Sequence, residues 1–455
     1  MAATGTFKGI GGRLWELRDN DRQDEAESVP QYPATGQTKV TNAADLTLPQ
    51  LSLIFVSVVA ALLPSVLGLG RTVLYVDPGS ITEDTRATPP SSFRRLCDAL
   101  AVAESEDTIL LHPGRYDAAV ERFPLQIEKA VTICSTGGPD ETVFIGPPRE
   151  AVFEVTAPGV EIRGIGIEHM GTGITVLADD VVITGNRIEL LSSASNVGTC
   201  GVWLAGARRA RVTENAFVNC GLALAGPRVG AADSDQPALT GLFEVGHDPE
   251  WFTTHVITGN TVNGRPLMYR VGAMGCLSGA GAGQVIIAGC SGVTISGLDI
   301  SCASIGLQIA HCTEVRILDC NFHGNSLFGL YVAYSDGCSV MNVSATGNNH
   351  GLDVRASSGT ELCSSIADGN EQGVFLSYTQ GTLLFDGSVC DNGVGVFLGN
   401  CSSCALHGNS ISANRLGIQA QHSEGLWIIR NQVTGNELSG IRLSPGSDRS
   451  TILDN

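Results

Sequence analysis

The sequence predicts an all-β fold: a right-handed, single-stranded parallel β-helix (a solenoid) of about 22-residue coils, with a short N-terminal capping helix. Three observations predict it. A glycine recurs every 22 or 23 residues, an asparagine recurs in phase with it, and an alternating aliphatic strand follows each glycine. The glycines are Gly306, Gly329, Gly351, Gly373, Gly395, Gly417 and Gly440. The asparagines are Asn325, Asn348, Asn370, Asn392, Asn414 and Asn436.

The residues one and three positions after each glycine are nearly always aliphatic, as in GLQIA, GLYVA and GVFLS. Alternation along a strand sends both to the same face, and repetition in every coil stacks them into inward columns. A third aliphatic column comprises Ile295, Ile317, Val340, Leu362, Leu384, Leu406 and Ile428. Three inward columns per coil are what a parallel β-helix needs. The asparagines are expected to form amide ladders at the turns.

Composition supports many short strands joined by tight turns. The chain has 56 glycines, 43% hydrophobic residues and only 5% aromatic residues. Its formal charge is −19, and no lysine follows Lys129. Because no basic patch interleaved with aromatic residues occurs, we expect no nucleic-acid partner.

The N-terminal part divides into a flexible polar tail over residues 1–45 and a hydrophobic segment over 46–70. The second segment carries no charge and is about long enough to cross a bilayer. We interpret it as a membrane anchor or a signal segment, with a buried helix as the alternative. The protein is therefore expected to be extracytoplasmic or at the cell surface, either membrane-anchored or secreted.

Residues 71–135 are expected to form the N-terminal cap and the first coils. An amphipathic helix is predicted over 91–105, with a serine as its N-cap, and strands are predicted on either side of it. The helix would cover an open sheet edge that otherwise invites aggregation. The β-helix then runs over 136–455, with a polar loop insertion at 228–254 and a tight turn at Asn263-Gly264.

The cysteines of the coils occupy columns that otherwise hold small or aliphatic residues, so we predict buried free thiols there. Cys401 and Cys404 are the closest pair in the sequence. A zinc site would need a second pair, or histidines at matching spacing. We predict no metal site and no cofactor.

Outward positions on the strands after glycine are where chemistry could take place. Tyr331, Tyr334, Phe375, Tyr378 and Phe397 could stack on the sugar rings of a polysaccharide, although a covered apolar patch would show the same pattern.

A second set of residues on this face suggests catalysis. Asp353, Arg355, His350 and Tyr331 could neutralise a uronate and move a proton from its C5. The alternative for Asp353 and Arg355 is an ordinary ion pair. Glycoside hydrolysis would need two facing carboxylates, and Asp353 is the single acid in this column.

The stretches NTVNGRPLMY (260–269) and GQVIIAGCSGVTISGLDISCASIGLQIAHC (283–312), with the coils that follow, resemble NosD-like β-helix proteins of the pectin-lyase-like superfamily, which carry carbohydrate-binding and sugar-hydrolysis repeats. The resemblance covers about residues 73–455. It implies an extracytoplasmic module that binds carbohydrate or is structural. The alternatives are a lyase or epimerase acting on a uronic-acid polymer, and a copper-maturation accessory.

Several motifs of that superfamily are missing from this chain. The Asp-Pro-His-Asp motif of mannuronan epimerases is absent, and residues 247–250 (His-Asp-Pro-Glu) only echo it. The Gly-His-Gly of polygalacturonases is absent. No lysine after Lys129 could act as a lyase base, although arginine fills that role in some lyases. The five methionines and nine histidines form no cluster suited to copper.

Overall fold

The computed structural model describes residues 71–79, 92–148, 150–169, 171–191, 199–227, 247–279 and 281–455. All of them belong to one compact unit, Leu69–Asn455. The predicted tail (1–45), the hydrophobic segment (46–70) and most of the insertion (228–254) lie outside the described residues. No helix in the described part of the chain is long and apolar enough to cross a membrane.

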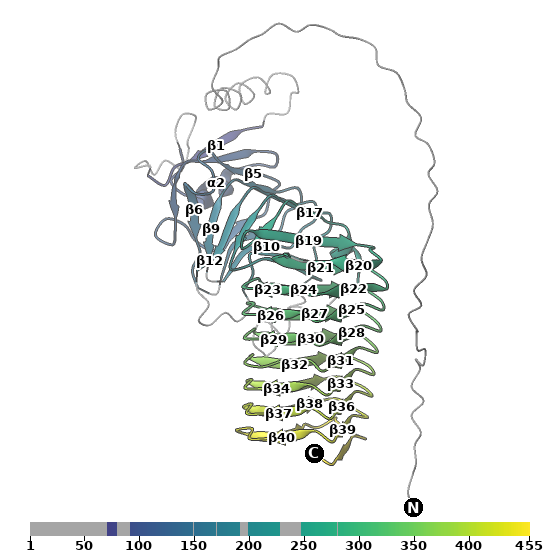
Figure 1. Ribbon diagram of the computed structural model, residues 1–455. Helices are drawn as coiled ribbons and strands as arrows, with labels where there is room; N and C mark the ends of the chain where they lie inside the picture. Colours follow the sequence, from purple (N-terminus) through teal and green to yellow (C-terminus); the bar gives the residue numbers. More distant parts are fainter. Residues whose placement is uncertain are drawn as a thin grey trace, which may run out of the picture. The chain divides into compact units, whose positions relative to one another are not determined.

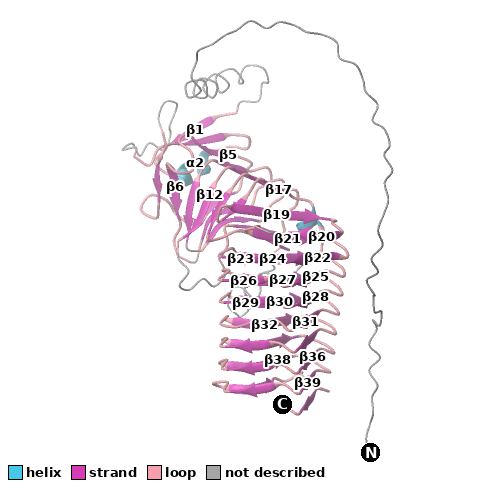
Figure 2. Cartoon of the chain, viewed as in Figure 1, coloured by secondary structure: helices cyan, strands magenta, loops and turns pink. Residues whose placement is uncertain are grey.

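The described residues form a right-handed parallel β-helix of about 14 turns, which confirms the predicted fold. Figures 1 and 2 show the stacked strands. The described residues also contain two short helices, α2 (Leu96–Val102) and α3 (Glu250–Thr253). The chain first builds one β-helix, Val73–Val262, and then a second, Arg265–Asn455. We refer to them as the first and the second β-helix.

Two sheets belong to the first β-helix alone. Sheet 1 contains β1 (Val73–Val76), β2 (Thr108–Leu111), β5 (Thr132–Ser135), β8 (Glu161–Arg163), β11 (Val182–Thr184), β14 (Arg211–Thr213) and β17 (Val256–Thr258). Sheet 2 contains β4 (Leu125–Ile127), β7 (Ala151–Val155), β10 (Thr172–Val176), β13 (Val202–Ala205) and β16 (Leu222–Ala225), which is its last strand.

A long sheet runs through both β-helices. Its first part contains β3 (Gly114–Tyr116), β6 (Thr142–Ile145), β9 (Gly166–His169), β12 (Arg187–Leu190), β15 (Ala216–Val218) and β18 (Thr261–Val262). Its second part contains β19 (Arg265–Val271), β21 (Gln284–Ala288), β24 (Ile305–Ala310), β27 (Phe328–Ala333), β30 (His350–Arg355), β32 (Gln372–Ser377), β35 (Val394–Gly399), β38 (Leu416–Gln421) and β41 (Ser439–Leu443).

The remaining strands complete the second β-helix. Sheet 3 contains β20 (Gly275–Ser278), β22 (Val293–Ser296), β25 (Arg316–Leu318), β28 (Ser339–Met341), β31 (Glu361–Cys363), β33 (Leu383–Phe385), β36 (Ala405–His407), β39 (Trp427–Ile429) and β42 (Thr451–Leu453). Two short sheets contain β23 (Asp299–Ser301), β26 (Asn321–His323) and β29 (Ser344–Thr346), and β34 (Ser388–Cys390), β37 (Ser410–Ser412) and β40 (Gln432–Thr434).

Strand register confirms the predicted inward columns. Leu330 lies opposite Leu307 and Leu352, and all three are buried. The asparagine ladder is also confirmed. Asn392 accepts hydrogen bonds from the backbone and side-chain N–H groups of Asn370, and its own amide donates to Asn414. Each coil thus copies the contacts of the coil before it.

The recurring glycine is needed for space and not for an unusual φ, since none of the seven has a positive φ. A Cβ on Gly395 would lie 2.6 Å from the carbonyl oxygen of Gly417 and 2.8 Å from the amide nitrogen of Asn414. A Cβ on Gly440, in the last of these coils, would meet only Val433, at 3.3 Å.

We therefore expect Gly395→Ala to lower the free energy of unfolding by about 1–3 kcal/mol through overpacking. Gly440→Ala is the matched control and should cost well under half as much. Urea unfolding followed by circular dichroism measures both variants. Equal losses in the two would show that the glycine column is not set by contact with the next coil.

Strand direction reverses between the two β-helices. The predicted turn at Asn263-Gly264 is present, with φ values of +51° and +75°, and it joins β18 to β19 as an antiparallel pair. The sequence predicts this turn within one continuous β-helix over 136–455. Instead, all later coils run in the reversed direction, because β19 pairs parallel with β21.

The reversal moves the core to the other face of the long sheet. Val262, in the core of the first β-helix, lies opposite Arg265. Directly paired residues, and residues two apart on a strand, share a face. The face of Val262 therefore continues through Leu267 and Gln284 into the outward column of the second β-helix. Near the junction, that outward face adjoins the end of the first β-helix.

The capping helix is present but shorter than predicted. Helix α2 spans Leu96–Val102, buries Leu96, and packs against β1 and β4. The predicted serine cap is wrong, because Arg95 occupies the N-cap position without a side-chain bond. The carboxylate of Glu121 accepts the backbone N–H groups of Leu96 (2.5 Å) and Cys97 (3.2 Å) instead. A residue distant in sequence supplies the cap.

Candidate functional site

The outward column of the long sheet begins with two glutamines that hold the end of the first β-helix. The Gln284 side chain accepts the backbone N–H of Leu222 at 3.0 Å and donates to its carbonyl at 2.6 Å. Gln308 binds Leu224 in the same way, at 3.2 and 2.6 Å. These bonds satisfy the edge of β16, the last strand of sheet 2, which would otherwise be open.

A small buried cluster seals the same contact. It joins residues of the first β-helix, such as Trp203 and Ala223, to Phe328 and Tyr331 of the second. Gly221 donates its backbone N–H to Ser304 Oγ at 2.8 Å. Tyr331 is therefore only 1% exposed, although its side chain points away from the core of its own β-helix.

One coil further along lies a buried group of charges. Arg355 binds both carboxylate oxygens of Asp353, at 2.8 and 2.9 Å. His350 Nδ1 lies 2.7 Å from Asp353 Oδ2, in polar contact with the same carboxylate. Asp353 is fully buried, and Arg355 and His350 are nearly so.

Burial by itself raises the pKa of Asp353, but the adjacent Arg355 charge and the polar contacts of His350 and Arg355 outweigh it. The pKa of Asp353 therefore lies below its ordinary value, and the carboxylate is ionised at neutral pH. A carboxylate held in this way is a weak base.

Aromatic rings surround the Arg355 guanidinium. Its central carbon lies 4.7 Å from the centroid of Phe375, 5.7 Å from Phe328 and 5.9 Å from Tyr331. Phe375 in turn stacks on Phe397, with centroids 4.8 Å apart and planes 12° apart. The buried charges are thus connected through Phe375 to a ring that reaches the surface.

The outward face becomes accessible at Phe397. Phe397, Gln419 and Gln421 are half-buried, and Arg442 is exposed. A turn column runs alongside, formed by the residue that directly follows each of these strands. Tyr378, which follows β32 in this column, is 55% exposed. Register places Gln419 opposite Phe397, and Arg442 opposite Gln419. An aromatic, an amide and a guanidinium therefore lie in one line on successive coils.

The structure thus separates the candidate residues into two groups. The proposed catalytic residues Tyr331, His350, Asp353 and Arg355 come together and are buried. Of the proposed carbohydrate-binding residues, Phe375 is buried, Tyr334 and Phe397 are half-buried, and Tyr378 is exposed. The assignment of either activity to them stays a prediction.

Sequence reasoning missed Phe328, which directly precedes the recurring Gly329. Its ring stacks on Tyr331 with centroids 4.7 Å apart. The position before glycine was the available signal, since His350 and Gln372 occupy it in the next two coils. Gln419 and Arg442 were in the outward column but were not singled out.

Metal ligation was tested on the thiols. All fourteen cysteines are free thiols, and Cys401 and Cys404 both lie within 3.5 Å of Thr379 Oγ1. Both are buried in the core. The described residues contain no group of three or more histidine, cysteine, aspartate or glutamate side chains that could hold a metal ion. They do not fit a copper site.

Comparison with solved structures gives matches at low similarity. The A-module of mannuronan C-5 epimerase AlgE4 of Azotobacter vinelandii is 16% identical, over 79% of this chain and 88% of that one, with a TM-score of 0.32. Pectate lyase Pel9A is 12% identical, over 78% and 79%, with a TM-score of 0.27. The periplasmic alginate epimerase AlgG is 12% identical, over 75% and 74%, with a TM-score of 0.26. We base no functional argument on these likenesses.

Two family models match the chain, and no curated protein does. The model described as periplasmic copper-binding protein (NosD) matches residues 255–455, which cover the second β-helix. The model described as protein of unknown function (DUF1565) matches residues 81–312, just over half of the chain. The chain therefore belongs to the DUF1565 family of proteins of unknown function and continues into a NosD-like β-helix.

Proposed function

We propose that this protein is an extracytoplasmic β-helix module that binds a polysaccharide along the accessible end of the long sheet's outward face. The observation that carries the proposal is the row formed by Phe397, Gln419 and Arg442 on successive coils, with Tyr378 beside it. The proposed partner is a polysaccharide, and the oligomeric state is left open.

The spacing of the row suits a chain of sugar rings. Neighbouring strands lie about 4.8 Å apart, close to the length of one sugar unit. Phe375 fixes the ring of Phe397 from behind, so little conformational freedom is lost when a sugar stacks on it. The amide of Gln419 offers donors and an acceptor to hydroxyl groups, and Arg442 can bind a carboxylate.

An extracytoplasmic location rests on two observations. The NosD family is described as periplasmic. The sequence also carries the uncharged segment 46–70, which we propose directs the β-helices away from the cytoplasm and tethers them to a membrane or is removed. Cell fractionation with protease protection tests this location.

Replacing both Phe397 and Tyr378 with alanine should weaken polysaccharide binding by roughly 5- to 150-fold, because ring stacking contributes about 0.5–1.5 kcal/mol per ring beyond burial. Calorimetric titration with alginate, polygalacturonate and neutral glucans and xylans measures it. Phe385→Ala, at a half-buried outward position on sheet 3, is the matched control and should bind as the wild type does. Equal loss in both variants, or no binding to any polymer, would contradict the proposal.

A second candidate is a lyase or epimerase acting on a uronic-acid polymer, favoured by the contact among His350, Asp353 and Arg355 with Tyr331 nearby. The low pKa of Asp353 and the burial of the group weigh against it. A lyase would release unsaturated products that absorb in the ultraviolet, and an epimerase would exchange the C5 proton with solvent. Binding without either signal supports the first proposal.

A further inference from the structure

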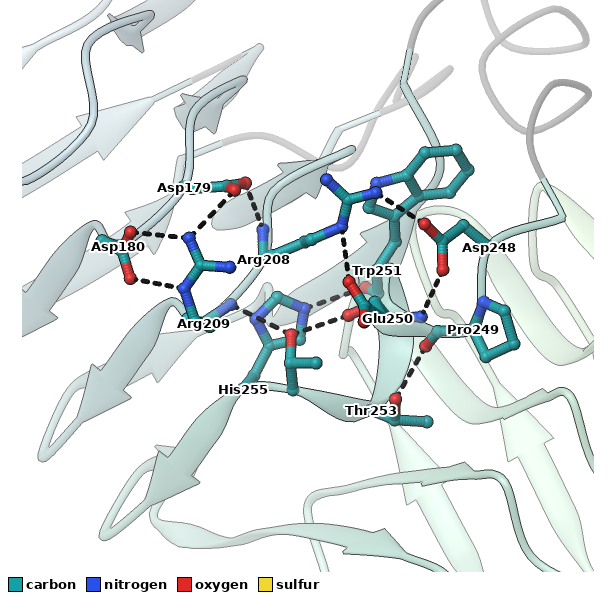
Figure 3. A network of polar contacts seen from close by, with 11 residues as sticks. Asp179, Asp180, Arg208, Arg209, Asp248, Pro249, Glu250, Trp251, Thr253 and His255 are labelled. Atoms are coloured by element: carbon teal, nitrogen blue, oxygen red, sulfur yellow. Dashed lines mark hydrogen bonds and ion pairs between the residues drawn. The ribbon is translucent and has the colours of Figure 1, made fainter.

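Residues 247–255, at the end of the insertion, contact both β-helices. Figure 3 shows their polar contacts on the side of the first β-helix. The segment contains helix α3 (Glu250–Thr253). On the side of the first β-helix, Arg208 pairs with Asp248 at 2.5 Å and with Glu250 at 3.1 Å. The same guanidinium lies over the ring of Trp251, 5.6 Å from its centroid.

On the other side, α3 packs against the second β-helix. Phe252 is 1% exposed and lies 5.2 Å from the ring of His311. Tyr269 donates its hydroxyl to the carbonyl of Phe252 at 2.7 Å. His311 stacks on Tyr334 with centroids 4.9 Å apart, and His247 meets the same tyrosine edge-on at 5.2 Å.

His255 is held in a form that cannot accept a proton without losing a bond. Its Nδ1 accepts the backbone N–H of Ala210 at 3.2 Å, and its Nε2 lies 2.8 Å from the carbonyl of Trp251. The first contact needs a bare Nδ1 and the second needs a proton on Nε2, so the ring is neutral. Protonation would set N–H against N–H at Ala210.

The surroundings of His311 also favour its neutral form. Its Nε2 is buried and has no hydrogen-bond partner within the described part of the chain. Burial, followed by the nearby His247, lowers the pKa of His311, while Asp248 opposes them. Burial also lowers the pKa of His255, against the Trp251 carbonyl and Asp179.

The charged and titratable groups around these two histidines come from every element packed against them. They are Asp179, Asp180, Arg208, Arg209, His247, Asp248, Glu250, Tyr269, Cys290 and Tyr334. Arg208 and Arg209 form ion pairs with all four acidic residues of this group, Asp179, Asp180, Asp248 and Glu250. Their charge is therefore largely neutralised and does little to stabilise imidazolium ions.

We propose that residues 247–255 form an acid-released latch between the two β-helices, docked when His255 and His311 are neutral and detached when both are protonated. Release of the segment would break its hydrogen bond with Tyr269, on β19, and its ring contacts with Tyr334, in the turn that follows β27. The Gln284 and Gln308 bonds to β16 contain no titratable group, so the contact between the β-helices persists. The inference does not depend on polysaccharide binding.

The two histidines determine how the stability of the docked state depends on pH. An undocked histidine has a pKa of about 6.5, and both docked histidines have lower pKa values. The docked state therefore binds fewer protons, and its stability falls as pH drops below about 6.5. Where the undocked histidines are protonated and the docked ones stay neutral, the logarithm of the docking constant changes by up to two for each pH unit, one for each histidine.

Hydrogen exchange tests the latch. Protection of the amides of Arg209, Ala210 and residues 250–253, corrected for intrinsic rates, is measured between pH 4.5 and 7.5, because these amides bond to or within the latch. The wild type should lose protection as the pH falls, with a slope of up to two per pH unit. His311→Phe keeps the stacking, cannot titrate, and should reduce the slope to about one. His255→Gln can keep both hydrogen bonds without charge, and adding it should reduce the slope to about zero.

His422→Gln is the matched control, since His422 is exposed in the same turn column as His311 and should leave the slope unchanged. If His255→Gln prevents docking even at pH 7.5, the His311→Phe variant alone still tests the proposal. A pH-independent wild type, or a slope unchanged by His311→Phe, would overturn it.

Discussion

Arg355→Met is expected to lower the free energy of unfolding by about 3–5 kcal/mol at neutral pH, because it leaves the Asp353 carboxylate buried and unpaired. The arginine provides two of the bonds to that carboxylate, and no water can replace them at a fully buried site. Methionine keeps much of the apolar contact with Phe375, so the loss reports mainly on charge.

The double variant Asp353→Asn/Arg355→Met is the control. It removes both charges and should be more stable than Arg355→Met alone. In the wild type the pKa of Asp353 lies below its ordinary value, so the pair stabilises the protein above that ordinary value and the contribution is lost in acid. In Arg355→Met the unpaired carboxyl should instead take up a proton on folding, so its deficit should shrink as pH falls towards 5.

Chemical denaturation at pH 5 and pH 7.5 measures these differences. A double variant as unstable as Arg355→Met, with the same deficit at both pH values, would show that Arg355 acts through packing alone.

Asn392→Ala should cost on the order of 2–4 kcal/mol, since its side chain makes four hydrogen bonds in the middle of the ladder. Removing it leaves the backbone N–H of Asn370 and the carbonyl of Ala367 buried without partners. Asn392 is 3% exposed, which keeps water from replacing the lost bonds.

Asn436→Ala is the matched control at the end of the ladder. Asn436 accepts two bonds from Asn414 and donates one to Ile411, but it is half-buried, so water can take its place. We expect less than half the loss seen for Asn392→Ala. Unfolding midpoints of the two variants measure the difference, and a larger loss at Asn436 would refute the burial argument.

The coils could be predicted because each repeats the same local pattern. The spacing of glycine, asparagine and aliphatic residues is enough to place Leu330 over Leu307 and Asn370 beside Asn392. The reversal could not be predicted in this way. Asn263-Gly264 announces a tight turn, but whether the chain resumes its former direction depends on how β19 pairs with β21, which no local signal contains.

The sequence could predict which candidate site residues share a face of the sheet, but not how exposed their side chains are. Register follows from the repeat, so Tyr331, Asp353 and Phe375 share a face as expected. Their surroundings are set by tertiary contact. For Tyr331, partners in the first β-helix, such as Trp203, lie more than a hundred residues earlier in the chain. The cap of α2 was missed for the same reason, because Glu121 lies 25 residues from Leu96.

The switch of the core from one face of the long sheet to the other divides the second β-helix into two kinds of coil. The early coils must match the end of the first β-helix, through residues such as Gln308 and Tyr331. The later coils contact their neighbours in the stack. A whole unit such as residues 373–394 could therefore be duplicated or removed in frame, with glycine and asparagine returning in phase. The length of the second β-helix can therefore change by whole coils while its junction with the first β-helix stays unchanged.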